Sequence, residues 1–216
     1  TPVDLGIAPD CEDTLQIMAA GAKGSDMLIT CGGASVGDHD LVQKVLGDIG
    51  LEIDFWKIAM RPGKPLMFGH LGETRMLGLP GNPGSAFVTA TLFLLPLLRH
   101  LGGAASPLPR TGSARLLSPL AQGGTRTEFL RAKLSKDGIA PLAKQSSGLI
   151  SSLAVADALI EWPSGSEAQP AGLGRLQREG RVFADAALAH AFTETCPGHA
   201  TMLTGRHPSG LGIAGN

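Results

Sequence analysis

The sequence of 216 residues contains no tyrosine, and aromatic residues make up only 4% of it. Its three cysteines, Cys11, Cys31 and Cys196, are scattered along the chain, which excludes a disulfide scaffold and favours a reducing, cytoplasmic compartment. Charged residues make up 17% and the net charge is −1, so neither nucleic acid nor an anionic membrane is expected as the main partner. The longest apolar stretch, residues 86–98, is interrupted by threonines and a proline and is too short to span a bilayer.

Hydrophobic residues nonetheless make up 43% of the chain, which is enough to bury the core of a soluble globular protein. The length predicts one or two domains.

A glycine-rich stretch, residues 27–40 (MLITCGGASVGDHD), organises the first half of the chain. A short apolar strand is expected to end at Thr30, and an amphipathic helix to begin at Leu41. This order is typical of anion sites in α/β proteins, because glycines let the backbone approach a phosphate and the helix start presents free N–H groups. The same stretch also fits a tight structural turn in which Asp40 caps the helix.

The rest of the first half alternates strands with helices. Apolar runs at 3–7 and 27–30 predict strands, and residues 66–69 and 76–79 predict a short strand pair. Apolar residues at helical spacing predict helices that begin near Asp10 and Leu41. This order predicts an α/β domain over residues 1–104, with a parallel sheet covered by helices.

The next apolar segment, residues 51–60, is expected to be one strand, and three cations lie at its end or just beyond it. Because strand residues two apart share a face, Lys57 and Arg61 are predicted to lie together near its C-terminal end, where open α/β sheets bind ligands. A stiff loop then carries Lys64 between two prolines. The pattern fits an anion site better than a solvated basic edge, which is the alternative.

A second turn, Pro80-Gly81-Asn82-Pro83, lies between a strand and the most apolar helix of the chain. Asn82 is a suitable N-cap and Pro83 a suitable first helical residue, so this helix start is also suited to an anion. A purely structural role fits equally well, because proline and glycine at a helix start need no ligand. Pro96 lies within the apolar pattern and is expected to kink or break the helix.

The composition changes between residues 101 and 109, which indicates a domain boundary. Short strands are predicted at 114–120, 127–134, 139–144 and 158–162, with a hairpin at Asp137-Gly138 and a helical turn or long loop within 146–156. They indicate a small all-β, barrel-like domain over residues 105–170.

Residues 171–216 are predicted to form an irregular, disordered tail. An alanine-rich stretch at 182–192 fits a helix, but no other period is present. Cys196 and His199 have the spacing of two metal ligands, but no second pair follows them, so a metal site is not expected there.

Taken in order, these motifs resemble the molybdopterin molybdenumtransferase family, which includes bacterial MoeA and the E domain of gephyrin. The resemblance rests on residues 4–7, the loop at 30–40, residues 55–57 with 61–65, and the turn at 78–83. It implies a molybdopterin-binding α/β domain followed by a small β domain.

The resemblance also implies an activity, the insertion of molybdate into adenylylated molybdopterin with Mg²⁺ and release of AMP. Asp40, Lys57 and Arg61 would be catalytic, and Asp40 would also be the metal ligand. The residues implied to bind the substrates are Gly32, Gly33, Ser35, Gly37, Lys64, Pro80, Gly81, Asn82 and Pro83. A dianion and a pyrophosphate need cations, helix starts and an acid-held Mg²⁺, and the sequence offers all three. Arg61 stands where the family often has lysine, which keeps the charge but changes its geometry.

Members of the family carry two further N-terminal domains and an acidic Ser-Thr-Gly-Asp-Glu turn ahead of the matching region. The chain begins with Thr1, so the resemblance implies an N-terminally incomplete C-terminal part of such a protein. A homodimer would then form through the absent domains. The expected terminal barrel strand is also replaced by residues 171–175 and the tail.

Three functions are therefore compared. The first is the transferase, or a piece of it that is inactive alone. The second is a non-catalytic pterin-binding or assembly module. The third is a molybdopterin adenylyltransferase, which shares the glycine-loop domain, but the β domain and the turn with Pro80 and Pro83 argue against it.

Overall fold

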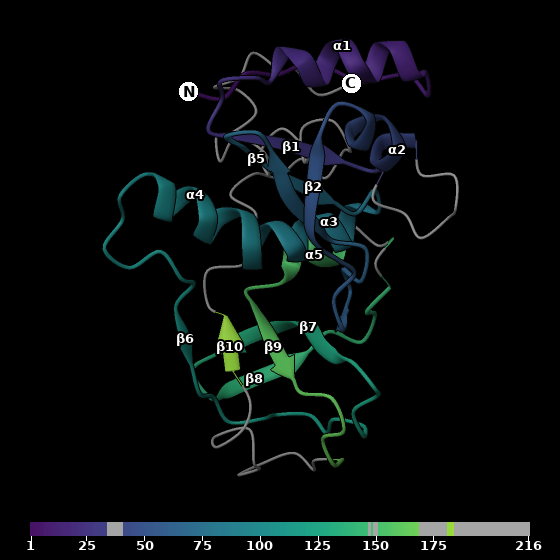
Figure 1. The fold of residues 1–216 in the computed structure, drawn as a ribbon. Coiled ribbons are helices and arrows are strands. Elements are labelled where there is room, and N and C mark those ends of the chain that lie inside the picture. Colours follow the sequence, from purple (N-terminus) through teal and green to yellow (C-terminus); the bar gives the residue numbers. More distant parts are fainter. Residues whose placement is uncertain (34–40, 147, 149–150, 169–180, 184–216) are drawn as a thin grey trace. The chain divides into compact units, whose positions relative to one another are not determined.

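The computed structural model describes residues 1–33, 41–146, 148, 151–168 and 181–183, with only the backbone described for the last three. The chain divides into two compact units, each described here by itself (Figure 1). The first unit comprises Thr1–Ile58 and Gly63–Asn82, and the second comprises Ala59–Pro62 and Pro83–Asn216.

A sheet of four strands forms the centre of the described part of the first unit, in the order β1-β5-β4-β2. β1 pairs with β5 in parallel, whereas β4 is antiparallel to both of its neighbours, β5 and β2. The strands are β1 (Met27–Cys31), β2 (Leu51–Trp56), β4 (Met67–Leu71) and β5 (Thr74–Leu79). The α/β class is confirmed, and the sheet is mixed because β4 and β5 form the predicted hairpin, which turns at Gly72 with φ +61°. β1, β5 and β2 therefore run in the same direction.

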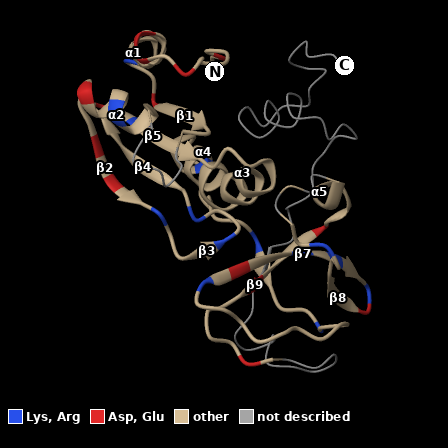
Figure 2. Ribbon diagram, turned by 90° about the vertical axis from the view of Figure 1, so that its right-hand side faces the viewer, with Lys and Arg blue, Asp and Glu red and all other residues tan. Residues whose placement is uncertain are grey.

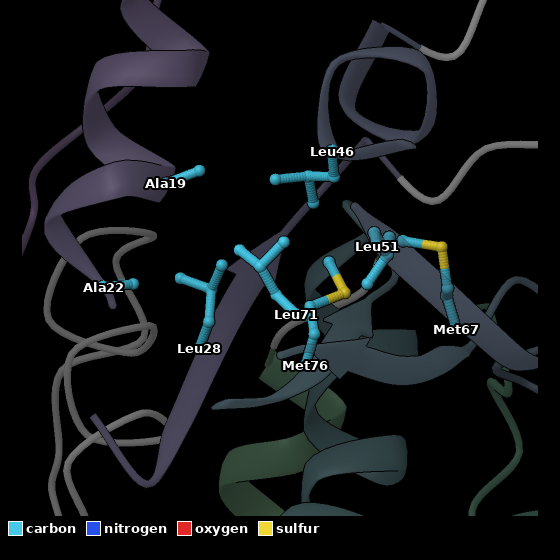
Figure 3. Packing of buried hydrophobic residues seen from close by; sticks show 8 residues of the cluster. All are labelled: Ala19, Ala22, Leu28, Leu46, Leu51, Met67, Leu71 and Met76. Atoms are coloured by element: carbon cyan, nitrogen blue, oxygen red, sulfur yellow. The ribbon is translucent and has the colours of Figure 1, made fainter. Parts of the chain in front are cut away.

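Two helices cover one face of this sheet, α1 (Glu12–Gly21) and α2 (Leu41–Asp48). Figure 3 shows side chains from α1, α2 and the sheet pointing toward one another. We call this group the first-unit core, and it comprises Ala19, Ala22, Leu28, Leu46, Leu51, Met67, Leu71 and Met76, with Val42, Ile49, Ile53 and Trp56 packed against it. The helical spacing read from the sequence is thus the spacing that buries one side of each helix.

The strand predicted at residues 3–7 is wrong. The segment has no strand structure, and Val3 and Ile7 are 79% and 95% exposed. An extended segment is stable only when its N–H and C=O groups are paired with a neighbour. Among the described strands of this sheet β1 pairs only with β5, and nothing pairs with residues 3–7.

The single strand predicted for residues 51–60 is also wrong. β2 ends at Trp56, and the next residue, Lys57, adopts a left-handed backbone with φ +72° that no strand accommodates. A bulge lies between Ile53 and Phe55 and shifts the register of β2 against β4. Residues 60–61 form β3 (Met60–Arg61), which pairs with a strand of the second unit instead.

A continuous helical segment opens the larger part of the second unit. It consists of α3 (Pro83–Thr89), a π-helical turn η1 (Ala90–Leu94) and α4 (Leu95–Leu101). Pro83 is the first helical residue, as predicted. The predicted break at Pro96 does not occur, because the preceding π-turn accommodates a residue that has no N–H to donate.

This helical segment is also longer than the apolar stretch estimated from the sequence. By length and composition Pro83–Leu101 could cross a membrane, which the estimate from residues 86–98 had excluded. Its most apolar window is 56% buried inside the structure, which is typical of the core helix of a globular unit.

The second unit also contains a β-sheet in the order β3-β7-β9-β10-β6, with β8 paired to β7. Its further elements are β6 (Thr111–Gly112), β7 (Thr127–Ser135), β8 (Gly138–Pro141), α5 (Ser151–Val155), β9 (Ala158–Trp162) and β10 (Arg181–Phe183). The predicted hairpin at Asp137-Gly138 is confirmed, and so is a helical turn within 146–156. The strand predicted at 114–120 is wrong, since this segment contributes only isolated bridge residues, Leu116, which pairs with Ile139, and Leu120. β10 lies within the segment predicted to be irregular and includes the first two residues of the expected helix at 182–192.

Arg131 of β7 is buried in this unit at 1% exposure. Its backbone N–H donates to Gln145 Oε1 at 3.0 Å, and its carbonyl accepts from Gln145 Nε2 at 2.9 Å, so the amide side chain continues the strand pairing. The Arg131 side chain donates from Nη1 to the Ser146 carbonyl at 3.1 Å. The three contacts hold the loop after β8 against β7.

The pairing of β2 with β4 leaves no room for a side chain at Gly69. A Cβ atom there would overlap the Glu52 carbonyl oxygen and lie 3.1 Å from Ile53 Cα, both of them backbone atoms. We expect Gly69→Ala to lower the free energy of unfolding by about 2 kcal/mol or more, measured by urea denaturation. The matched control is Gly47→Ala in α2, where a Cβ would meet nothing within 4 Å and helix propensity should raise stability by about 0.5–1 kcal/mol. Equal stability of the two variants would contradict the backbone clash.

Candidate functional site

The sheet direction brings three turns of the first unit to one end of the sheet. Gly32 follows β1, Pro80 follows β5 and Lys57 follows β2, and these three strands run in the same direction. The turns after codirectional strands lie at the same end of a sheet, which is where open α/β sheets bind ligands. We call this region the strand-end site.

Two glycine turns touch each other in the strand-end site. The Gly32 N–H donates to the Leu79 carbonyl at 3.0 Å, which extends the pairing of β1 and β5 by one residue. A Cβ on Gly81 would lie 3.3 Å from Gly32 Cα, and Gly32 itself has φ +90°. A Cβ on Gly81 would crowd Gly32, and the left-handed backbone of Gly32 favours glycine, so two stretches of bare backbone meet here. The structure thus brings together two motifs that lie about fifty residues apart in the sequence.

Gly33 is constrained by the start of α2. It has φ +69°, and a Cβ there would overlap the Val42 side chain, with Val42 Cβ only 2.7 Å away. The first turn of α2 therefore packs directly against the glycine turn. Helix starts carry backbone N–H groups without intrahelical partners, which favour an anion.

Lys57 is held in place by its backbone and by a neighbouring ring. Its N–H donates to the Leu66 carbonyl at 3.0 Å, and its Nζ lies 3.8 Å from the centroid of the Trp56 ring. A left-handed non-glycine residue costs on the order of 1 kcal/mol or more, and such residues concentrate at functional sites. Figure 2 shows acidic residues along β2 and basic residues on the chain that continues beyond it.

Lys64 belongs to the same loop. Its carbonyl accepts hydrogen bonds from the N–H groups of Ile58 and Leu66, both at 3.0 Å. Lys57 and Lys64 are both exposed, so both ammonium groups are available to a ligand. Both lysines belong to one loop instead of one strand face, and their role in binding an anion stays a prediction.

Arg61 does not share a strand face with Lys57, and that prediction is wrong because the left-handed backbone at Lys57 ends the strand. Arg61 lies in the second unit, where its Nη1 is 3.6 Å from Glu128 Oε1. Its guanidinium is mostly exposed, so this ion pair is weak. The catalytic role of Arg61 stays a prediction.

Three predicted site residues, Ser35, Gly37 and Asp40, lie outside the described residues. In the part of the chain that the structure describes, no three His, Cys, Asp or Glu side chains come together to hold a metal ion. The described residues alone therefore do not fit a Mg²⁺ site, and Asp40 stays the predicted ligand. Pro80 is buried beside this region, while Gly81 and Asn82 are exposed.

Two polar side-chain atoms in the strand-end site were not predicted as functional from the sequence. Thr30 Oγ1 and Trp56 Nε1 are buried and, within the described structure, have no hydrogen-bond partner. Buried polar groups are almost always paired, so each exception needs an explanation. Both residues lie in motifs that carry the family resemblance. The sequence does not reveal that their polar atoms are unpaired.

Comparison with known proteins assigns the chain to a family. Residues 1–100 match the family described as "Probable molybdopterin binding domain", and residues 107–172 match the "MoeA C-terminal region (domain IV)". The chain therefore belongs to the MoeA family of molybdenum cofactor biosynthesis proteins, as the motifs had indicated.

The relatives in sequence carry matching names. A "Molybdopterin molybdenumtransferase" from Staphylococcus aureus is 31% identical over 167 residues, which cover 76% of this chain and 40% of that protein. The "Molybdenum cofactor synthesis protein cinnamon" of Drosophila melanogaster is 34% identical over 177 residues, which cover 77% of this chain and 28% of that protein. The chain thus spans less than half the length of these relatives.

The fold comparison agrees. A molybdopterin biosynthesis MoeA protein from Pyrococcus horikosii superposes with a TM-score of 0.66 at 30% identity, covering 85% of this chain and 43% of that one. Residues 169–216 match a different family, "Type I phosphodiesterase / nucleotide pyrophosphatase". Apart from β10, that segment lies outside the described residues.

The thiols of Cys31 and Cys11 provide a test of the environment of the glycine turn. Desolvation raises the pKa of Cys31 to about 11, whereas hydrogen bonds from the Thr14 backbone and side chain lower the pKa of Cys11. Because the thiolate is the nucleophile, at pH 8 iodoacetamide should label Cys11 much faster than Cys31. Peptide mapping by mass spectrometry measures both rates, and the Cys31 rate should keep rising with pH up to about 11. Equal rates at pH 8 would contradict a desolvated thiol beside the turn.

Proposed function

We propose that this chain is the molybdopterin- and oxyanion-binding part of a molybdopterin molybdenumtransferase. In this reaction molybdate is inserted into adenylylated molybdopterin and AMP is released. The observation that carries the proposal is the meeting of two bare glycine turns at the strand-end site, in the unit that also holds Lys57 and Lys64. The match of residues 1–100 to a molybdopterin-binding domain supports it.

Each described part of the site suits an anionic substrate. The Gly32 and Gly81 turns let a phosphate or molybdate approach the backbone, and the start of α2 adds a positive dipole. Lys57 and Lys64 supply charge that is free to neutralise the ligand. Catalysis of this kind depends on positioning and on stabilising negative charge. Ser35, Gly37, Asn82 and Pro83 would add contacts to the substrates, and Arg61 a further cation.

Asp40 is the one residue that we propose as a ligand of Mg²⁺. A hard cation beside a pyrophosphate neutralises charge and prefers carboxylate oxygens. We assign no step to the ion. We also propose that the protein is a homodimer and cytoplasmic, because the resemblance to the family implies both.

The second candidate function is a pterin-binding module without catalysis. It is the alternative left open by the family match, because the description of residues 1–100 as a molybdopterin-binding domain concerns binding and not catalysis. The two functions differ in AMP release from adenylylated molybdopterin in the presence of molybdate and Mg²⁺. Release that is lost in Asp40→Asn supports the transferase, whereas binding of the substrate without release supports the module. A chain that does not bind the substrate contradicts both.

The charge at Lys57 can be tested by substitution. We expect Lys57→Ala to weaken molybdate binding about tenfold, the effect of losing one charge-assisted contact of about 1.4 kcal/mol. Isothermal titration calorimetry with molybdate, and with tungstate as its analogue, measures the change. The matched control is Lys44→Ala, which removes an exposed cation of α2 that pairs with Glu12. If both variants bind like the wild-type chain, Lys57 is part of a solvated basic edge.

A further inference from the structure

The two unpaired polar atoms of the strand-end site lie on one row across the sheet. Thr30 is aligned with Gly78, Gly78 with Met67, and Met67 with Trp56. Side chains at aligned positions project from the same face of a sheet. A Cβ on Gly78 would lie 3.2 Å from Met67 Cε and 3.5 Å from Thr30 Oγ1, so these two side chains flank the glycine on that face.

The bulge in β2 is what brings Trp56 onto this face. Leu51 and Ile53 contact the first-unit core, and regular alternation would send Phe55 to the same side. The register shift between Ile53 and Phe55 turns Phe55 outward, where it is 38% exposed, and turns Trp56 toward the core. Bulges often re-aim a side chain next to a functional site.

The composition of the row differs from that of an ordinary core row. Its ends carry a hydroxyl and an indole N–H, both buried and unpaired in the described structure, and its centre is a glycine. Met67 fills the space above Gly78 with an unbranched thioether, the side chain that most easily adopts another rotamer. Three strand spacings separate the two ends, about 14 Å between backbones.

We infer that Thr30 and Trp56 bind the ring system of the pterin substrate. The Trp56 N–H donates to an acceptor of the ring, and Thr30 Oγ1 bonds to the opposite end, nearest the glycine turn that receives the phosphate. The Met67 side chain moves aside when the ring binds above Gly78. This inference rests on the proposed function, and it assigns to that site two residues that recognise the uncharged part of the substrate.

Two other polar groups show what a structural role would look like. Trp162 Nε1 donates to the Ala121 carbonyl at 3.2 Å, and Thr89 Oγ1 lies 2.9 Å from the Ser85 carbonyl. Both belong to the second unit and are paired within the fold. Removing the Trp162 donor would leave the Ala121 carbonyl without this partner and destabilise the protein, whereas the Thr89 hydroxyl only adds to the bonds of its helix. Removing an unpaired donor leaves no carbonyl without its partner.

The test uses Trp56→Phe and Thr30→Val, which keep the ring and the branched shape but remove the polar atoms. Phenylalanine also keeps a ring beneath the Lys57 ammonium. Each variant should bind molybdopterin about tenfold more weakly, the effect of one lost hydrogen bond. The melting temperature of Thr30→Val should stay the same or rise, whereas Trp56→Phe loses some packing against the first-unit core. Molybdopterin released anaerobically from a molybdenum enzyme is the probe, and equilibrium dialysis gives its affinity.

Trp162→Phe and Thr89→Val are the matched controls. Both should leave the affinity unchanged, and Trp162→Phe should also lower the melting temperature. Trp162→Phe also leaves Trp56 as the sole tryptophan, since the chain has two, so its fluorescence should change when molybdopterin is added.

The outcomes separate the two proposals. If the wild-type chain binds molybdopterin and both Trp56→Phe and Thr30→Val bind it equally well, the inference is wrong and the proposed function stands. A lowered melting temperature with unchanged affinity also overturns the inference, because the polar atoms would then be structural. If the wild-type chain does not bind molybdopterin, the proposed function fails and the inference fails with it.

Discussion

The parallel pairing of β1 with β5 is the interaction on which the site depends. It sets Thr30 opposite Gly78 and lets the Gly32 N–H reach the Leu79 carbonyl, so the turns after the two strands begin at the same level. Glycine favours this close approach, because a Cβ on Gly81 would lie only 3.3 Å from Gly32 Cα and Gly32 has a left-handed backbone. The hydrophobic contacts between α1, α2 and the sheet hold this pairing, because Leu28 of β1 and Met76 of β5 belong to one core.

The positive charges of Lys57 and Lys64 are positioned by the loop that follows β2. The chain leaves β2 with one left-handed residue, and backbone hydrogen bonds from Lys57 and Ile58 then fasten the loop. In a strand, the alternation of side chains between the two faces would have set the positions of the cations. Here the backbone geometry of the loop sets them. The stacking of the Lys57 ammonium on Trp56 adds a contact that restricts a flexible side chain. The site thus combines a rigid glycine backbone with two cations whose ammonium groups stay in water.

The parts of the fold that could be predicted from sequence are those with local signals. The apolar periods of α1 and α2, the strand before Gly32, the hairpin at Gly72 and the helix start at Pro83 all show in nearby residues. Residues 3–7 carry a strand pattern too, but a strand also needs a pairing partner, which no local pattern reveals. The failure at 57–61 has the same origin, because Lys57 has no intrinsic preference for φ +72° and β3 forms only through its pairing with β7. The unpaired atoms of Thr30 and Trp56 likewise depend on what surrounds them.

The path of the chain through its two units has a mechanical consequence. Residues 59–62 are part of the second unit, while the residues before and after them are part of the first. Lys57 and Lys64 therefore sit on either side of a short excursion that is anchored to β7 by strand pairing. The loop that carries both cations is therefore closed at its ends by hydrogen bonds of the first unit and held at its middle by strand pairing that belongs to the second.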